Sequence, residues 1–121
     1  MKKLLIIFCL FASSLFAFEH LTVDNIDEKI KGKKVIIDFY ATWCPPCKVI
    51  AKNLTTYDST KPEEITIYKV DIDDQRELVS KFGVVSIPTL VYVYDGKVVK
   101  LTVGVQSLDE INDNVNSHLL K

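Results

Sequence analysis

The chain has 121 residues, of which 48% are hydrophobic and 26% charged. These figures are typical of one globular domain, and they exclude a disordered chain, a collagen-like repeat and a multidomain enzyme. Fifteen basic and sixteen acidic side chains leave a formal net charge of −1, so no nucleic acid or other polyanion is expected as a partner.

The N-terminal segment has the pattern of a secretory signal peptide. A short segment with two lysines precedes an apolar run from Leu4 to Phe16. This run is shorter than the roughly 20 apolar residues of a membrane-spanning helix, so we expect removal of residues 1–17 and no stable membrane insertion. Cleavage after Ser14 and retention as an uncleaved anchor stay open. The remaining domain, residues 18–121, is expected to be exported to the periplasm of a bacterial envelope.

The first half of this domain alternates helices and strands. A helix is predicted over Asp24–Lys31, where two isoleucines four residues apart share one face and Gly32 follows as a stop. Val35–Ala41 is a nearly unbroken apolar run, typical of a central strand that is covered on both faces. After Cys44, the spacing of the apolar residues predicts a second helix with one buried face, made of Cys47, Ile50, Leu54 and Tyr57.

A second strand and a short third helix follow. Ile65–Ile72 alternates apolar and polar residues, as a half-buried strand does. Asp74, three residues before Glu77, gives an acidic variant of the helix-capping pattern. A short helix is therefore predicted after it, and Gly83 is placed to end that helix.

The last part of the chain reads as a hairpin and a closing helix. Thr89–Tyr94 and Val98–Val103 are rich in strand-forming residues and are joined through Asp95-Gly96, which predicts an antiparallel pair. Ser107–Glu110 is a full capping box. The helix that it begins is predicted to bury one face, made of Leu108, Ile111, Val115 and Leu119.

This order of elements predicts an α/β fold. Strand-helix-strand units favour a parallel core, so we expect a mixed central β-sheet flanked by helices on both faces. Open sheets of this kind bind and react at the carboxyl ends of their strands. The segment Trp43–Cys47 follows the first central strand directly, so any chemistry is expected there.

Two of the three cysteines, Cys44 and Cys47, belong to the domain, since Cys9 lies in the apolar run and would leave with it. A bridge that closes so short a loop removes little chain entropy and makes a poor structural staple. A zinc site needs four ligands, and the two histidines, His20 and His118, lie at opposite ends of the domain. We therefore interpret the pair as a redox dithiol that uses neither a metal nor a cofactor.

The redox interpretation has a physical mechanism. At the cap of a helix, the sulfur of Cys44 faces the positive end of the helix dipole, which favours the thiolate. This thiolate would attack a substrate disulfide and form a mixed disulfide. Cys47, one helical turn further on, would then attack that bond and release the reduced product.

Several motifs follow one another in a fixed order along the domain, which are Asp38–Lys48 (DFYATWCPPCK), Asp71, Ile87–Leu90, Asp95-Gly96 and Val103-Gly104. In these motifs the domain resembles the thioredoxin family over essentially its whole length, from about Glu19 to Leu120. The resemblance implies the thioredoxin fold, protein disulfides as substrates, Cys44 as the nucleophile and Cys47 as the resolving thiol.

The same resemblance implies an acid-base group beneath the dithiol. Asp38 matches the buried carboxylate that helps to move the proton of Cys47, and burial would raise its pKa toward a useful range. Lys69 matches the lysine that the family often places near this carboxylate. The alternatives are a strand-end Asp38 that faces water and an exposed Lys69 without a role.

The resemblance also implies a substrate-binding rim. Pro88 corresponds to the cis-proline that faces the dithiol, and the backbone of Ile87 would pair with the substrate chain as an added strand. Trp43, Pro45 and Gly104 are assigned to the rim of that groove. For Trp43 and Gly104, the alternatives are an ordinary tryptophan at the edge of the core and a turn glycine.

Pro45 departs from the common pattern, since cytosolic thioredoxins usually have glycine there. Because Pro45 and Pro46 lack N–H groups, a capping sulfur on Cys44 can receive a backbone hydrogen bond only from Cys47. Fewer donors stabilise the thiolate less, which favours a moderately reducing protein.

The leading interpretation is an exported, monomeric protein-disulfide reductase that a membrane electron donor keeps reduced. An oxidase that introduces disulfides is the first alternative, although the 104 residues that follow the signal peptide leave no room for the inserted helical domain of the family's oxidases. A thioredoxin for cytochrome c maturation is a further alternative. A non-catalytic binding module on the same scaffold represents another class of protein.

Overall fold

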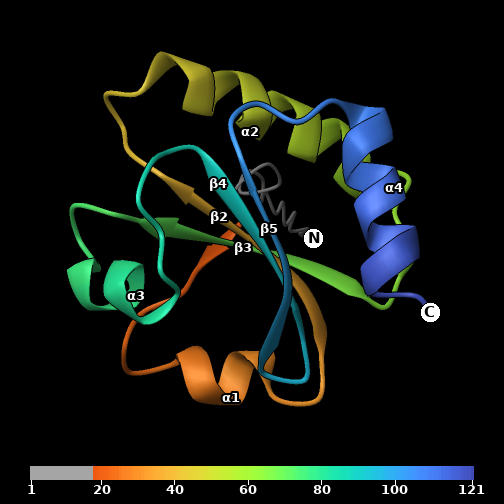
Figure 1. Cartoon of the computed structure of the whole chain (residues 1–121), viewed down its shortest axis with the longest axis horizontal. Coiled ribbons are helices and arrows are strands. Elements are labelled where there is room, and N and C mark those ends of the chain that lie inside the picture. The colour runs from red at the N-terminus through yellow and green to blue at the C-terminus, as the bar shows by residue number, and fades with distance from the viewer. Residues whose placement is uncertain (1–17) are drawn as a thin grey trace, which may run out of the picture.

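One mixed sheet of five strands forms the centre of the computed structural model, which describes residues 18–121 (Figure 1). The expected signal peptide and Cys9 lie outside the described residues. The elements are, in order, β1 (Glu19–His20), α1 (Ile26–Ile30), β2 (Lys34–Tyr40), α2 (Pro45–Asp58), β3 (Ile65–Asp71), α3 (Arg76–Lys81), β4 (Thr89–Tyr94), β5 (Lys97–Val103) and α4 (Leu108–His118). Within residues 18–121, no helix is long and apolar enough to cross a membrane.

The strand order β1-β3-β2-β4-β5 places β2 in the middle of the sheet. β1 and β2 run parallel to β3, whereas β4 is antiparallel to β2 and β5 is antiparallel to β4. Asp95 and Gly96 form the two-residue turn between β4 and β5, both with positive φ (51° and 81°), as such hairpin turns require. The expected mixed sheet, its central strand and its hairpin are therefore confirmed.

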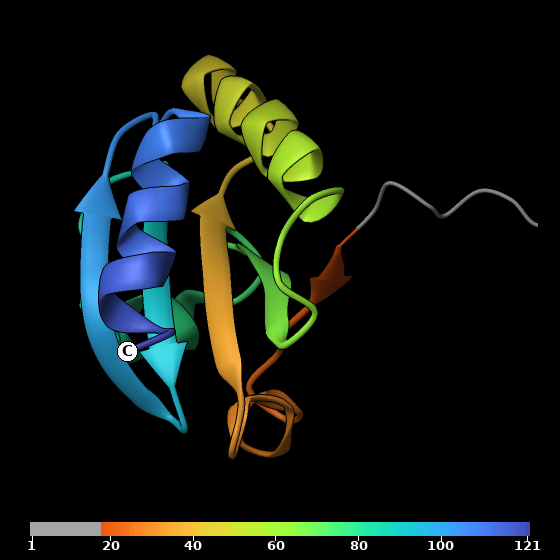
Figure 2. The ribbon, with the colours of Figure 1, turned by 90° about the vertical axis from the view of Figure 1, so that its right-hand side faces the viewer.

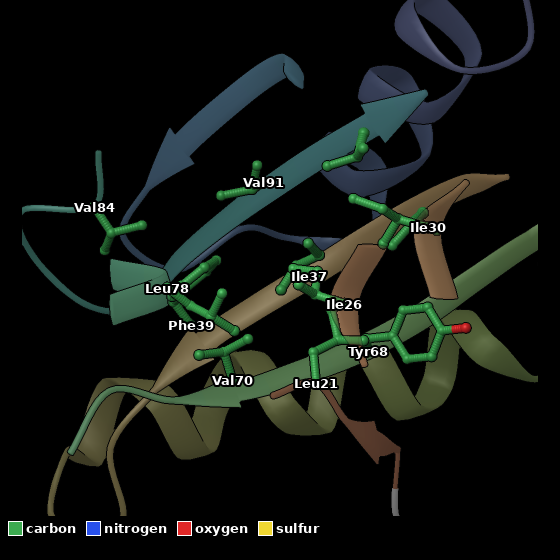
Figure 3. Packing of buried hydrophobic residues seen from close by; sticks show 12 residues of the cluster. Leu21, Ile26, Ile30, Ile37, Phe39, Tyr68, Val70, Leu78, Val84 and Val91 are labelled. Carbon is green, nitrogen blue, oxygen red and sulfur yellow. The ribbon is translucent and has the colours of Figure 1, made fainter. Parts of the chain in front are cut away.

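Helices cover both faces of the sheet. Successive side chains of β2 point to opposite faces and therefore pack against different helices. Val35, Ile37 and Phe39 belong to a core cluster with residues of α1 and α3 (Figure 3). Ile36 belongs to a second cluster with residues of α2 and α4. Asp38 shares the face of Ile36, so the sheet places its carboxylate on the side of α2.

The sequence explains why α2 begins where it does. In Figure 2 the chain leaves the carboxyl end of β2 and enters α2 after a short connection. Pro45 and Pro46 occupy the first positions of the helix, where a missing N–H leaves no intrahelical bond unmade. The buried residues of the helix are those of the expected apolar face, namely Cys47, Ile50, Leu54 and Tyr57.

The start of α3 differs from the expectation. The helix begins at Arg76 with Gln75 as its N-cap and without a side-chain capping bond, so the predicted cap at Asp74 is wrong. The backbone N–H groups of Asp74 and Gln75 both donate to the carbonyl of Asp71, at 3.1 and 2.9 Å, and this turn delays the helix. The end of the helix agrees with the prediction, because Gly83 follows it with a φ of +68°.

α4 confirms its predicted cap and corrects its predicted face. Glu110 donates its N–H to the Ser107 hydroxyl at 3.1 Å, and Ser107 donates its N–H to the Glu110 carboxylate at 2.8 Å, which completes the capping box. Leu108, expected to be buried, is 40% exposed, because the buried face of the helix begins at Ile111.

The N-terminal part of the domain also differs in detail. The first helix is confined to Ile26–Ile30, because Thr22 and Asn25 exchange side-chain hydrogen bonds in a turn before it. β1 was not predicted, since two residues are too few for any periodic pattern. It pairs with β3 and thereby brings His20 opposite Lys69.

Candidate functional site

The dithiol lies at the N-terminus of α2, where Cys44 and Cys47 form a disulfide. Cys44 is the N-cap residue, and its sulfur accepts a hydrogen bond from the N–H of Cys47 at 3.3 Å. The two residues between them are Pro45 and Pro46, which have no N–H to donate. The expected arrangement, a capping sulfur with a single backbone donor, is confirmed.

Both sulfur-bearing residues are nearly buried, and an exposed tryptophan stands beside them. Cys44 and Cys47 are 4% and 3% exposed, whereas Trp43 is 64% exposed. The indole Nε1 of Trp43 donates a hydrogen bond to the carboxylate of Asp73 at 2.8 Å, which fixes the ring at the surface. The sequence analysis missed Asp73, because no local pattern distinguishes it from the neighbouring Asp74.

The loop before β4 completes the rim of the dithiol. The Ile87–Pro88 peptide bond is cis, as the resemblance to thioredoxins implied. Ile87 packs against the cluster that Cys44 and Cys47 form with Ala41. Gly104, at the end of β5, donates its N–H to the carbonyl of Pro88 at 2.8 Å. Its φ of +96° favours glycine at this position.

An apolar groove runs beside the dithiol on the side of Ile87. It has a volume of about 410 Å³, and Ser86 contributes a hydroxyl to an otherwise mainly apolar lining. Val85, in this groove, is 91% exposed. The other lining residues are Trp43, Ile72, Val79, Val84 and Ile87. A substrate chain at the dithiol would therefore meet an apolar surface on this side.

A second hollow lies between α2 and the sheet, next to Cys47. Its volume is about 240 Å³, and its lining is polar as well as apolar: Asp38, Tyr40, Ala41, Thr42, Cys47, Lys48, Ala51 and Lys69. This hollow brings the Asp38 carboxylate and the disulfide-bonded Cys47 to the same space, as the sequence analysis expected for these two residues.

Asp38 is fully buried, and neither of its carboxylate oxygens has a hydrogen-bond partner among the described residues. Burial raises its pKa from 3.8 to about 7, because the charged form loses its hydration, while the positive charge of Lys69 opposes the change. Lys69 lies directly opposite Asp38 across β2 and β3. The alternative of an Asp38 that faces water is therefore wrong.

The site has the parts that dithiol-disulfide exchange needs, which are a capping thiol, a resolving thiol one turn further on and a buried carboxylate with a pKa near neutrality. No group of three or more potential metal ligands occurs among residues 18–121. Fold and site together define a thiol-disulfide oxidoreductase.

Comparison with known proteins identifies the family. The thioredoxin family model matches residues 17–117. The thioredoxin of Bacillus subtilis is 42% identical over 85 residues, which cover 70% of this chain and 82% of that protein. The thioredoxin of Staphylococcus haemolyticus is 37% identical over 103 residues, or 85% of this chain and 99% of the relative. The chain belongs to the thioredoxin family.

Solved structures agree with this assignment. A mutant thioredoxin from Halobacterium salinarum has a TM-score of 0.76 and 29% sequence identity, with coverage of 89% of this chain and 96% of that one. The thioredoxin of Malassezia sympodialis has a TM-score of 0.75, also at 29% identity, and the match covers 84% of this chain and 90% of that one. The thioredoxin fold is therefore confirmed.

Proposed function

We propose that this thioredoxin works as a protein-disulfide reductase and that electrons from a membrane donor keep it reduced. The observation that carries the direction of the reaction is the single backbone donor to the Cys44 sulfur. Strong oxidants of this chemistry are oxidising because their reduced form is stabilised. A thiolate with one donor is less stabilised than one with two, so the pair should give its electrons away readily.

The reaction follows from the positions of the groups. The thiolate of Cys44 attacks one sulfur of a substrate disulfide, forms a mixed disulfide and releases the other substrate sulfur as a thiolate, which takes up a proton. Asp38 accepts the proton of Cys47, whose thiolate then attacks Cys44. This step releases the second substrate thiol and leaves Cys44 and Cys47 as a disulfide, so two electrons have passed to the substrate.

The substrate-binding side of this proposal uses the apolar groove. An extended substrate segment would lie along the backbone of Ile87, with an apolar side chain against Trp43 and Val85. Backbone pairing gives affinity without strong sequence specificity, as suits an enzyme that reduces many proteins. Pro45 is exposed next to Cys44 and would border the same segment. We take the monomer as the working form.

The experiment that tests the direction is the equilibrium reduction potential of the Cys44–Cys47 pair against a thiol buffer of known potential. Reference dithiols range from about −270 mV for thioredoxin to about −120 mV for a strong periplasmic oxidant. We expect a value near the reducing end of that range. A value near the oxidising end would contradict the proposal and favour an enzyme that introduces disulfides.

The proposed location is the periplasm, after removal of residues 1–17. The pattern of a basic start and an apolar run supports it, and the thioredoxin family model begins its match at residue 17. We expect the protein purified from the envelope of an expressing bacterium to start at Phe18, as measured by intact mass. A chain that keeps Met1 and stays in the cytoplasmic fraction would contradict export.

A further inference from the structure

Tyr40 lies at the carboxyl end of β2, between the dithiol pocket and the edge of the sheet. Its phenol oxygen is 2.7 Å from Nε2 of His20, which β1 presents from the edge of the sheet. The ammonium of Lys69 lies over the Tyr40 ring, 4.4 Å from the ring centroid. A cation at this distance from an aromatic face is attracted by the ring quadrupole. One tyrosine therefore connects the edge strand to Lys69.

The register of the sheet brings this contact to the active site. His20, Lys69 and Asp38 lie opposite one another on β1, β3 and β2, so their side chains share one face of the sheet. Tyr40, Lys69 and Asp38 line the same hollow beside Cys47. The ring of Tyr40 therefore holds the Lys69 ammonium on the wall of the pocket that contains the Asp38 carboxylate.

Lys69 has competing partners nearby. Asp71 lies two residues further along β3 and directly opposite Tyr40. Burial raises the pKa of the Tyr40 phenol, and the negative charges of Asp71, Asp38 and Asp74 raise it further. A lysine on a flexible four-carbon stem can turn toward the half-exposed Asp71 or the exposed Asp74. Lys48 of α2 is the other cation of the pocket, and its ammonium donates to the carbonyl of Thr42 at 3.4 Å. Of these two cations, Lys69 is the one whose positive charge lowers the pKa of the Asp38 carboxyl against the effect of burial.

We propose that Tyr40, fixed by His20, is a positioning residue for disulfide exchange, because its ring keeps the Lys69 ammonium beside Asp38 and away from Asp71 and Asp74. The inference rests on the proposed function in one respect, namely that Asp38 accepts the proton of Cys47. Tyr40 packs against the cluster of Ala41, Cys44 and Cys47, but in this scheme it exchanges neither a proton nor a sulfur bond with them.

The test measures the titration of the Asp38 carboxyl carbon by NMR in the oxidised full chain, with ¹³C-labelled aspartate. An opposite charge within 4–6 Å moves a carboxyl pKa by roughly 1–3 units, so release of Lys69 in Tyr40→Leu should raise the Asp38 midpoint by roughly half a unit or more. Tyr40→Phe keeps the ring but loses the bond to His20, so it should give a smaller rise. His20→Ala should match Tyr40→Phe.

Two variants separate positioning from a general disturbance. Tyr94→Leu removes the other cation-π contact found within residues 18–121, in which the Lys34 ammonium lies 5.4 Å from the ring centroid at the far end of β2, and it should leave Asp38 unchanged. In a Lys69→Met background, Tyr40→Leu should cause no further rise. A rise that persists without Lys69 would overturn the proposal, as would a folded Tyr40→Leu protein with an unchanged midpoint.

Two further readouts keep the result unambiguous. If Tyr40→Leu does not fold, as judged by thermal unfolding, an unchanged Asp38 midpoint in both Tyr40→Phe and His20→Ala overturns the proposal. Reduction of insulin by the unmodified protein is measured in parallel. Failure there would contradict the proposed reductase function while the titration still decides the role of Tyr40.

Discussion

The Cys44→Ser variant should lose all catalysed reduction of protein disulfides. A serine hydroxyl at the cap of α2 is not ionised near neutral pH and cannot attack a disulfide, so no mixed disulfide can form. The measurement is the rate of insulin reduction in the presence of a small-molecule dithiol that regenerates the enzyme. We expect the rate of Cys44→Ser to equal that of the dithiol alone.

The Cys47→Ser variant should fail at a different step. Cys44 can still attack the substrate, but no second thiol lies one helical turn away to resolve the mixed disulfide. The covalent complex should therefore accumulate and be visible as an added mass that a strong reductant removes. Substrates captured in this way would show which proteins the enzyme reduces.

A matched control exists in the third cysteine. In a protein prepared with residues 1–17 retained, Cys9→Ser removes a thiol that lies outside the described residues, and it should leave insulin reduction unchanged. If both Cys44→Ser and Cys47→Ser kept the activity of the unmodified protein, the catalytic interpretation of this site would be wrong.

Asp38→Asn should make the protein more stable at alkaline pH. A pKa raised from 3.8 to about 7 means that ionisation of Asp38 is less favourable in the folded protein by about 4 kcal/mol, taken as an upper value. Between these two pH values the folded state keeps a proton that the unfolded state has lost. The contribution of Asp38 to the free energy of unfolding therefore falls as the pH rises from about 4 to about 7, and this contribution is constant above that range.

The measurement is urea unfolding of the oxidised protein at pH 4 and pH 8. Asparagine resembles the protonated carboxyl in size and charge, so Asp38→Asn should match the unmodified protein at pH 4 and exceed it at pH 8 by a few kcal/mol. The exposed Asp113→Asn, in the middle of α4, is the matched control and should show no such difference. Equal stabilities of Asp38→Asn and the unmodified protein at pH 8 would rule out a raised pKa.

The same substitution should slow disulfide exchange. An amide cannot accept the proton of Cys47, so resolution of the mixed disulfide should lose the part of its rate that acid-base assistance supplies. A variant that is more stable but less active would show that the unmodified protein gives up stability to keep an ionisable group in its apolar interior.

Local patterns in the sequence predicted the starts of α2 and α4 and the hairpin turn, because neighbouring residues determine these features. Two consecutive prolines follow Cys44 at the start of α2, and the capping box of Ser107 precedes α4. Asp95-Gly96 forms the turn that connects β4 to β5. Each of these features depends on hydrogen bonds or dihedral angles within a few residues. The resemblance to thioredoxins added Asp38 and the cis bond before Pro88, neither of which a local pattern marks.

The features that the sequence analysis missed depend on residues that are far apart in the chain. β1 exists because β3 pairs with it, and Asp73 matters because Trp43, 30 residues earlier, donates to it. Pairing between such distant residues leaves no periodic signal in the sequence. The delayed start of α3 is an exception, because it follows from a local turn in which the N–H groups of Asp74 and Gln75 donate to the carbonyl of Asp71.

The sequence by itself determined the chemistry, because a capping cysteine, two residues without N–H groups and a second cysteine one turn later define the dithiol. The tertiary structure decided its environment. The sheet register brought Lys69 opposite Asp38, and the packing of α2 over that face removed the carboxylate from water. Burial and charge act through space, so the pKa of Asp38 is a property of the folded domain.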